Sequence, residues 1–166
     1  MSHIATDHLF STGHMRIVHD GATFNRVEKT KFISKFDIAL RELRVCWKSR
    51  SDENCCACNK CYRTMITLEL LGKLERSSKF NLSKVDVRKI AKIYSPRHND
   101  IDFYHQISSL ASSKGRIDIV KAIDRSLKTS ARLNKLLKII RSFQNKRFIW
   151  RYAQPLGKAI LSRYIT

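Results

Sequence analysis

All five cysteines of the 166-residue chain lie in one stretch, Cys46-Trp-Lys-Ser-Arg-Ser-Asp-Glu-Asn-Cys-Cys-Ala-Cys-Asn-Lys-Cys61. A disulfide framework would spread its cysteines along the chain, because its bonds join distant segments of small secreted proteins. Tight clustering favours a metal site instead, since thiolates spaced by two residues reach one ion from a single turn. Cys55, Cys58 and Cys61 have this spacing, and Cys46 supplies a fourth sulfur. The stretch therefore predicts a zinc site of four thiolates.

Two alternatives to zinc stay open at the level of sequence. An iron–sulfur cluster is also held by four cysteines, and a Cys-x-x-Cys pair can be redox-active. We expect Cys56 to be a bystander between ligands, although Cys55 and Cys56 can exchange roles. Lys60 and Arg63 are expected to offset the charge of the thiolates. Four sulfurs leave no coordination position open, so the role predicted for zinc is structural.

The regions around the cysteines predict a mainly α chain. Short strands and the four-cysteine zinc loop come first, and a helical half follows. Asn25 and Glu28 have the spacing of a capping box, and Gly72 is placed to end a helix. The expected strands are 15–19 and 43–47; the expected helices are 26–43 with a break near 34–37, 62–71, 81–93, 100–110, 117–127, 131–143 and 156–164. We divide the chain into a zinc-binding module, 1–75, and a basic all-helical region, 76–166.

The net charge of +19 is unevenly distributed, because no acidic residue follows Asp124. Such a surface attracts phosphate, anionic lipid or an acidic protein partner. The region 131–143 has an apolar stripe and a separate basic face. That face is either a solvated surface or a contact for nucleic acid, and it contains Lys128, Arg132, Lys135 and Lys138. No apolar run approaches the ~20 residues of a membrane span, and a signal peptide is not recognisable, so we expect a cytoplasmic protein.

Two stretches of the chain, Leu43-Arg-Val-Cys-Trp47 and Asn54-Cys-Cys-Ala-Cys-Asn-Lys-Cys-Tyr-Arg-Thr64, resemble a known zinc region. It is the C-terminal zinc region of the 7-cyano-7-deazaguanine synthase group and of uncharacterised bacterial relatives. This group belongs to the PP-loop superfamily of N-type ATP pyrophosphatases, and the resemblance covers about the first 75 residues. In that group a cysteine precedes a Cys-Gly-x-Cys-x-x-Cys segment, so Cys56 takes the place of the glycine. The run Arg26-Val-Glu-Lys29 looks like the helix start that precedes the first zinc cysteine in the group.

The chain departs from the PP-loop enzymes at the nucleotide site. These enzymes hold ATP through a Ser-Gly-Gly-x-Asp-Ser loop, whereas this sequence contains no Gly-Gly pair. Glycines let the backbone of such a loop approach the anion. The resemblance therefore implies the C-terminal module of an ATP pyrophosphatase, with ATP held by a missing domain or a separate chain and no catalysis by this chain alone. The alternative function is a stand-alone zinc-containing protein that binds nucleic acid.

Six further residues are candidates for ligand contacts. Arg63 and Thr64 lie at the expected start of helix 62–71, where a cation and free N–H groups can bind an anion, although Arg63 can equally be a neighbour of the zinc. Should a partner domain complete the active site, the resemblance places four residues on the substrate side: His19, Asp20, Arg26 and Lys29.

Overall fold

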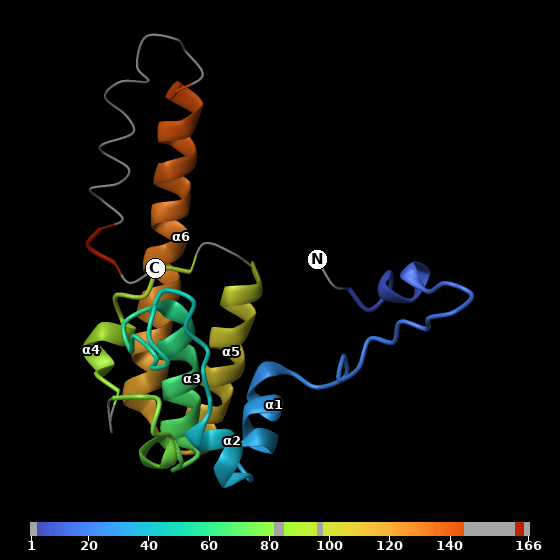
Figure 1. Cartoon of the computed structure of the whole chain (residues 1–166). Helices are drawn as coiled ribbons and strands as arrows, with labels where there is room; N and C mark the ends of the chain where they lie inside the picture. The colour runs from blue at the N-terminus through green and yellow to red at the C-terminus, as the bar shows by residue number, and fades with distance from the viewer. Residues whose placement is uncertain (1–2, 82–84, 96–97, 145–161, 165–166) are drawn as a thin grey trace.

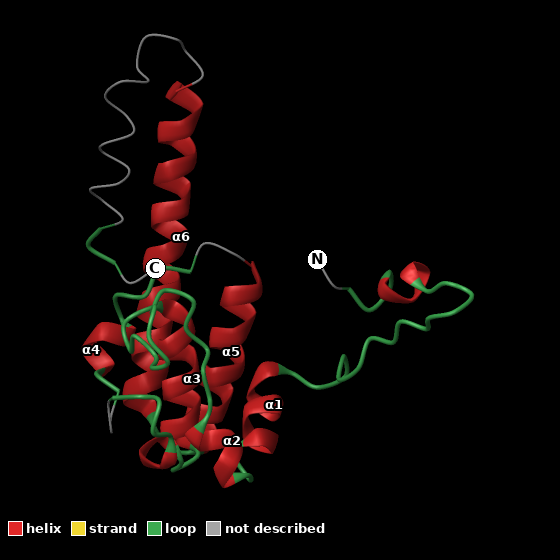
Figure 2. Ribbon diagram, in the orientation of Figure 1, coloured by secondary structure: helices red, strands yellow, loops and turns green. Residues whose placement is uncertain are grey.

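The computed structural model describes residues 3–81, 85–95, 98–144 and 162–164 of the chain. This part is mainly helical, as predicted (Figure 2). Its elements are the 3-10 helices η1 (Asp7–Phe10) and η2 (Leu74–Arg76), and the α-helices α1 (Arg26–Ile33), α2 (Asp37–Arg41), α3 (Asn59–Leu70), α4 (Val87–Ile90), α5 (His98–Ser113) and α6 (Ile117–Gln144).

Helix α3 occupies the centre of the helical body, with α5 and α1 packed against it (Figure 1). Helix α6 lies against α5 and α4, and it extends beyond the body as a long single rod. Most side chains of α3 are buried, and Met65, Ile66 and Leu68 have no exposed surface. The core continues without a break into Cys46, Cys58 and Cys61. The cysteine loop and the hydrophobic core therefore form one packed unit.

The predicted capping box, the break near 34–37 and the helix end at Gly72 are confirmed in the first half of the chain. The Asn25 side chain accepts a hydrogen bond from the N–H of Glu28, and the Glu28 side chain accepts one from the N–H of Asn25, which completes the capping box of α1. The expected break separates α1 from α2, and Gly72 follows α3 with a φ of +65°. A positive φ is a conformation that glycine adopts without steric penalty.

The two short strands, 15–19 and 43–47, were predicted wrongly. Apart from an isolated β-bridge at Ile93, the described residues contain no β-structure. A strand needs a neighbouring strand to take its backbone hydrogen bonds. In 43–47 the N–H groups of Val45 and Cys46 are instead bound by the side chain of Asn54. In 15–19 the N–H of Ile17 donates to the Ser11 hydroxyl, 2.9 Å away.

Two helix predictions were also wrong in extent. Of the expected helix 81–93, residues 82–84 lie outside the described residues, and the described part contains only α4, where Asp86 caps the helix start by accepting a hydrogen bond from the N–H of Arg88. The expected helices 117–127 and 131–143 are one helix, α6. The polar residues between them do not end it; the Ser126 hydroxyl donates to the Ile93 carbonyl at 2.7 Å, and the Ser130 hydroxyl accepts from the N–H of Ser95 at 2.9 Å. The expected helix 156–164 falls outside the described residues except for 162–164.

The N-terminal segment 3–25 extends away from the helical body (Figure 1). Its large apolar side chains are exposed: Ile4, Leu9, Phe10, Met15, Val18 and Phe24. Among the described residues, no helix combines the length and the apolar character that crossing a bilayer requires.

Candidate metal centre

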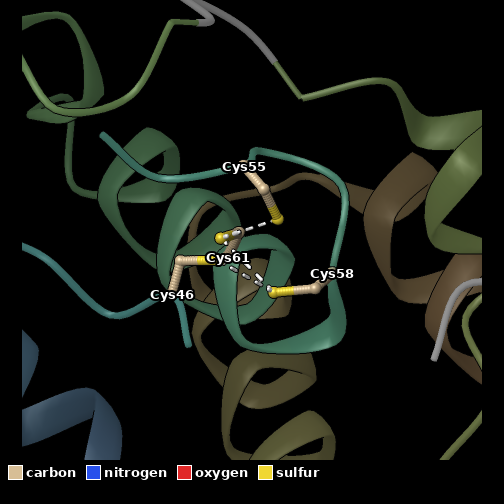
Figure 3. Close-up of side chains that lie close together, drawn as sticks. All are labelled: Cys46, Cys55, Cys58 and Cys61. Atoms are coloured by element: carbon tan, nitrogen blue, oxygen red, sulfur yellow. Dashed lines mark hydrogen bonds between the residues drawn. The ribbon is translucent and has the colours of Figure 1, made fainter. Parts of the chain in front are cut away.

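The structure brings the sulfurs of Cys46, Cys55, Cys58 and Cys61 together (Figure 3), with all four Sγ atoms within 4.8 Å of one another. The Sγ atoms of Cys46 and Cys58 are 4.0 Å apart, and those of Cys55 and Cys61 are 3.8 Å apart. The Sγ atoms of Cys58 and Cys61 are 3.4 Å apart. These are the four cysteines predicted from spacing, and together they can bind a metal ion.

The sulfur spacing fits one tetrahedral ion. With a metal–sulfur bond of about 2.3 Å, the sulfurs at the corners of a tetrahedron are about 3.8 Å apart. Three of the six separations, 3.4, 3.8 and 4.0 Å, lie around this value, and all six are at most 4.8 Å. In an iron–sulfur cluster the thiolates are divided between different irons, so their sulfurs stand farther apart than around a single ion. The geometry therefore favours a single ion over a cluster.

Two of the sulfurs are positioned by the start of α3. Cys58 is the N-cap of this helix, and its carbonyl accepts the N–H of Tyr62, while Cys61 lies in the first turn. The N-terminus of a helix carries partial positive charge, which stabilises thiolates. Both side chains are buried, because the first turn packs into the core. The backbone of α3 thus sets the separation of this pair.

The thiols interact strongly even without a metal. The hydrogen bond between Cys58 and Cys61 lowers the pKa of Cys58, and the same contact raises the pKa of Cys61. Two thiolates at this separation repel each other. Binding of a cation removes this conflict, because both sulfurs can then be thiolates facing the same positive charge.

Asn54 joins the two segments that supply the sulfurs. Its side-chain oxygen accepts hydrogen bonds from the N–H groups of Val45 and Cys46 at 2.9 and 3.0 Å. Its side-chain amide donates to the carbonyls of Leu43 and Lys79 at 2.9 and 3.2 Å. With 4% of its surface exposed, Asn54 is a buried polar side chain with partners for both ends. It holds Cys46 beside the other ligands.

The sequence prediction missed this role of Asn54. An amide carries a donor and an acceptor, so it can replace the neighbouring strand that 43–47 lacks. Two features of the sequence could have indicated it. Asn54 lies directly before the first cysteine of the tight loop, and asparagine side chains often form hydrogen bonds with nearby backbone groups.

Cys56 is not one of the clustered residues. Its φ is +51°, and it is the single non-glycine residue with positive φ in the described part of the chain. Its thiol donates to the Asn54 carbonyl at 3.4 Å. A side chain at positive φ is sterically unfavourable, which explains why glycine suits this position of the loop. Cys56 is thus a turn residue, as expected of a bystander.

Lys60 and Arg63 have partners other than the sulfurs that they were expected to neutralise. The Lys60 ammonium lies over the ring of Trp47, 3.2 Å from its centroid, and Arg63 forms an ion pair with Asp100 at 2.5 Å. The sulfur of Cys46 accepts a hydrogen bond from the backbone N–H of Ser49, at 3.3 Å. Backbone dipoles therefore assist in stabilising that thiolate.

Three of the six candidate contact residues, Arg26, Arg63 and Thr64, line a common pocket of about 310 Å³. The prediction that Arg63 and Thr64 lie at the helix start, with free N–H groups, was wrong. Helix α3 begins at Asn59, so both residues lie in its second turn, where the N–H groups form the helix's own hydrogen bonds. Their side chains, rather than free backbone groups, face the pocket.

The remaining three candidates lie elsewhere. The Nδ1 atom of His19 is 2.6 Å from a carboxylate oxygen of Asp7 in the extended N-terminal segment. Asp20 and Lys29 line a second, more apolar pocket of about 580 Å³ together with Phe32. The substrate-side set that the resemblance implied is therefore divided between separate places.

The basic residues predicted on one face of α6 are all exposed: Lys128, Arg132, Lys135 and Lys138. Leu133 and Leu137 of the apolar stripe are buried against Tyr94. Leu136 of the predicted stripe is 42% exposed, so the two-faced character is confirmed for Leu133 and Leu137 but not for Leu136. Contact of the basic face with nucleic acid stays a prediction. Comparison of the chain with protein-family models, curated proteins and solved structures finds no match.

We predict that Asn54→Ala lowers the free energy of unfolding by about 1–3 kcal/mol, because it leaves buried backbone N–H groups without acceptors. Metal affinity should fall about 10- to 100-fold, since Cys46 is no longer held in place. Urea unfolding and competition with a chelator measure the two effects. Asn99→Ala, the same change at an exposed position of α5, is the control and should alter stability by less than about 0.5 kcal/mol. Equal effects of the two variants would contradict the role of Asn54.

We predict that Cys56→Gly raises the free energy of unfolding by up to about 1 kcal/mol, because glycine relieves the positive φ. Cys56→Ala is the matched control, since it also removes the thiol but keeps the Cβ atom and the strain. Metal content measured by mass spectrometry should be unchanged in both variants. Loss of metal from both would instead make Cys56 a ligand.

Proposed function

We propose that Cys46, Cys55, Cys58 and Cys61 hold one zinc ion with a structural role. Support comes from a donor set made only of sulfur, a type that zinc and iron–sulfur centres use, and from separations that suit one tetrahedral ion. Four protein ligands fill the coordination shell, so water and substrate have no place on the metal. The ion would act on the fold and would not take part in a reaction.

The structural role follows from what the four sulfurs connect. A short segment separates Cys46 from the end of α2, whereas Cys58 and Cys61 lie at the start of α3. An ion bound to all of them fixes the start of α3 relative to the segment 43–47. Because α1 and α5 both pack on α3, the position of this start sets the positions of the other helices. Metal binding of this kind contributes directly to the free energy of folding.

For the biological role, we propose a zinc-stabilised module of a PP-loop ATP pyrophosphatase similar to 7-cyano-7-deazaguanine synthase. The observation that carries this proposal is the four-cysteine site with its flanks, Leu43-Arg-Val-Cys-Trp47 and Lys60-Cys-Tyr-Arg-Thr64. The positive φ of Cys56, at the position of the group's glycine, agrees with it. Because the sequence has no Gly-Gly phosphate loop, a separate domain or chain would bind ATP and transfer AMP.

Metal analysis tests the zinc proposal. Purified protein should contain one zinc per chain and be colourless, and a chelator should reduce its helical circular dichroism because the start of α3 is released. Cys58→Ser should abolish stoichiometric zinc, whereas Cys56→Ser, the same change at the bystander, should retain it. Iron and visible absorption in freshly prepared protein would contradict the assignment.

A test of the PP-loop proposal uses the chain and its genetic neighbourhood. The purified chain should release no AMP or pyrophosphate from ATP, since it lacks the phosphate loop. The DNA adjoining its coding sequence should encode a Gly-Gly-x-Asp-Ser segment, and the protein carrying it should co-purify with this chain. Absence of such a coding segment, or release of AMP by this chain alone, would contradict the proposal.

A further inference from the structure

The pocket beside the cysteine cluster gathers positive charge from three separate parts of the chain: α1, the segment 44–47 and α3. It opens between α1, α3, α5 and the segment 44–47, with a volume of about 310 Å³. Four cationic side chains line it: Arg26, Arg44, Lys60 and Arg63. Among the described residues, no carboxylate is part of its lining.

These cations are only partly neutralised. Arg63 pairs with Asp100 at 2.5 Å. Within the part of the chain that the structure describes, Arg26, Arg44 and Lys60 form no ion pair with a carboxylate. Like charges that converge on one cavity repel one another, and an anion between them removes that repulsion. The guanidinium group of an arginine can also form two parallel hydrogen bonds with the oxygens of one phosphate group.

Aromatic rings accompany the cations. Trp47 is 86% exposed, although it directly follows the buried ligand Cys46. The Lys60 ammonium lies over its ring, 3.2 Å from the centroid, and so much exposure leaves ring surface open to solvent. The guanidinium groups of Arg63 and Arg26 lie 4.7 and 5.2 Å from the ring centroid of Phe103, which also lines the pocket. The pocket therefore offers both phosphate binding and a surface for stacking.

We propose that this pocket binds a single nucleotide, with its phosphates between the four cations and its base stacked on Trp47. A ligand with an anionic end and a planar aromatic end uses both features of the lining, whereas free phosphate uses only one. The volume lies at the lower end of the range for small-molecule sites and suits one nucleotide better than a strand.

The site is independent of the proposed membership of the PP-loop superfamily. It depends on the folded cysteine loop, because Trp47 and Lys60 each lie next to a metal ligand in the sequence. Zinc content therefore serves as a check that each variant retains the loop.

Isothermal titration of the zinc-loaded full chain with ATP, and separately with inorganic triphosphate, tests the proposal. ATP should bind about tenfold more tightly than triphosphate, because only ATP has a base to stack. Trp47→Ala should reduce ATP affinity about tenfold and leave triphosphate affinity unchanged. Arg44→Gln should weaken both ligands, whereas Arg88→Gln, the same loss of charge on an exposed residue of α4, should weaken neither.

Three results would overturn the proposal. Equal losses in Arg44→Gln and Arg88→Gln would show attraction by net charge alone. ATP and triphosphate of equal affinity, with no effect of Trp47→Ala, would exclude stacking of the base. An oligothymidylate bound more tightly than ATP, with affinity that rises with its length, would show that the site holds a nucleic-acid strand.

Discussion

The convergence of four sulfurs on one point is the constraint on which the rest of this structure depends. Three of them lie within seven residues of chain, but Cys46 comes from a segment that has no secondary structure of its own. Bringing that segment to the others requires buried backbone groups to find partners away from water. The side chain of Asn54 supplies them, and the result joins the cysteine loop to the core around α3.

The placement of the cysteine loop also explains the surface beside it. Trp47 directly follows the buried Cys46, so its backbone is held in place although its side chain is 86% exposed. Lys60 is held in the same way between Cys58 and Cys61. The packed cysteine loop thus sets the positions of the side chains that face the neighbouring pocket.

Helix α6 shows that a short run of polar residues is a weak guide to where a helix ends in this chain. The polar run Lys128-Thr-Ser130 looked like a boundary between helices, yet it contains neither glycine nor proline, and nothing in it prevents helix continuation. Ser126 and Ser130 face the segment 93–95 and bind its backbone, so the polar residues serve packing between elements. Asp86 has the opposite effect, since its capping contact begins α4 inside a region that reads as one apolar-periodic helix.

The sequence alone determined the features that depend on neighbours in the chain. These are the four clustered cysteines, the capping box at Asn25, the break between α1 and α2, the end of α3 at Gly72 and the helical class, because spacing and local hydrogen bonds decide them. Only the tertiary structure decided the absence of strands at 15–19 and 43–47, the role of Asn54 and the meeting of Arg26 with Arg63 in one pocket. The role of Asn54 and the meeting of the two arginines depend on partners far away in the chain, such as Lys79 for Asn54 and Phe103 for Arg26. A spacing rule carries no information about such partners, since folding of the whole chain brings them together.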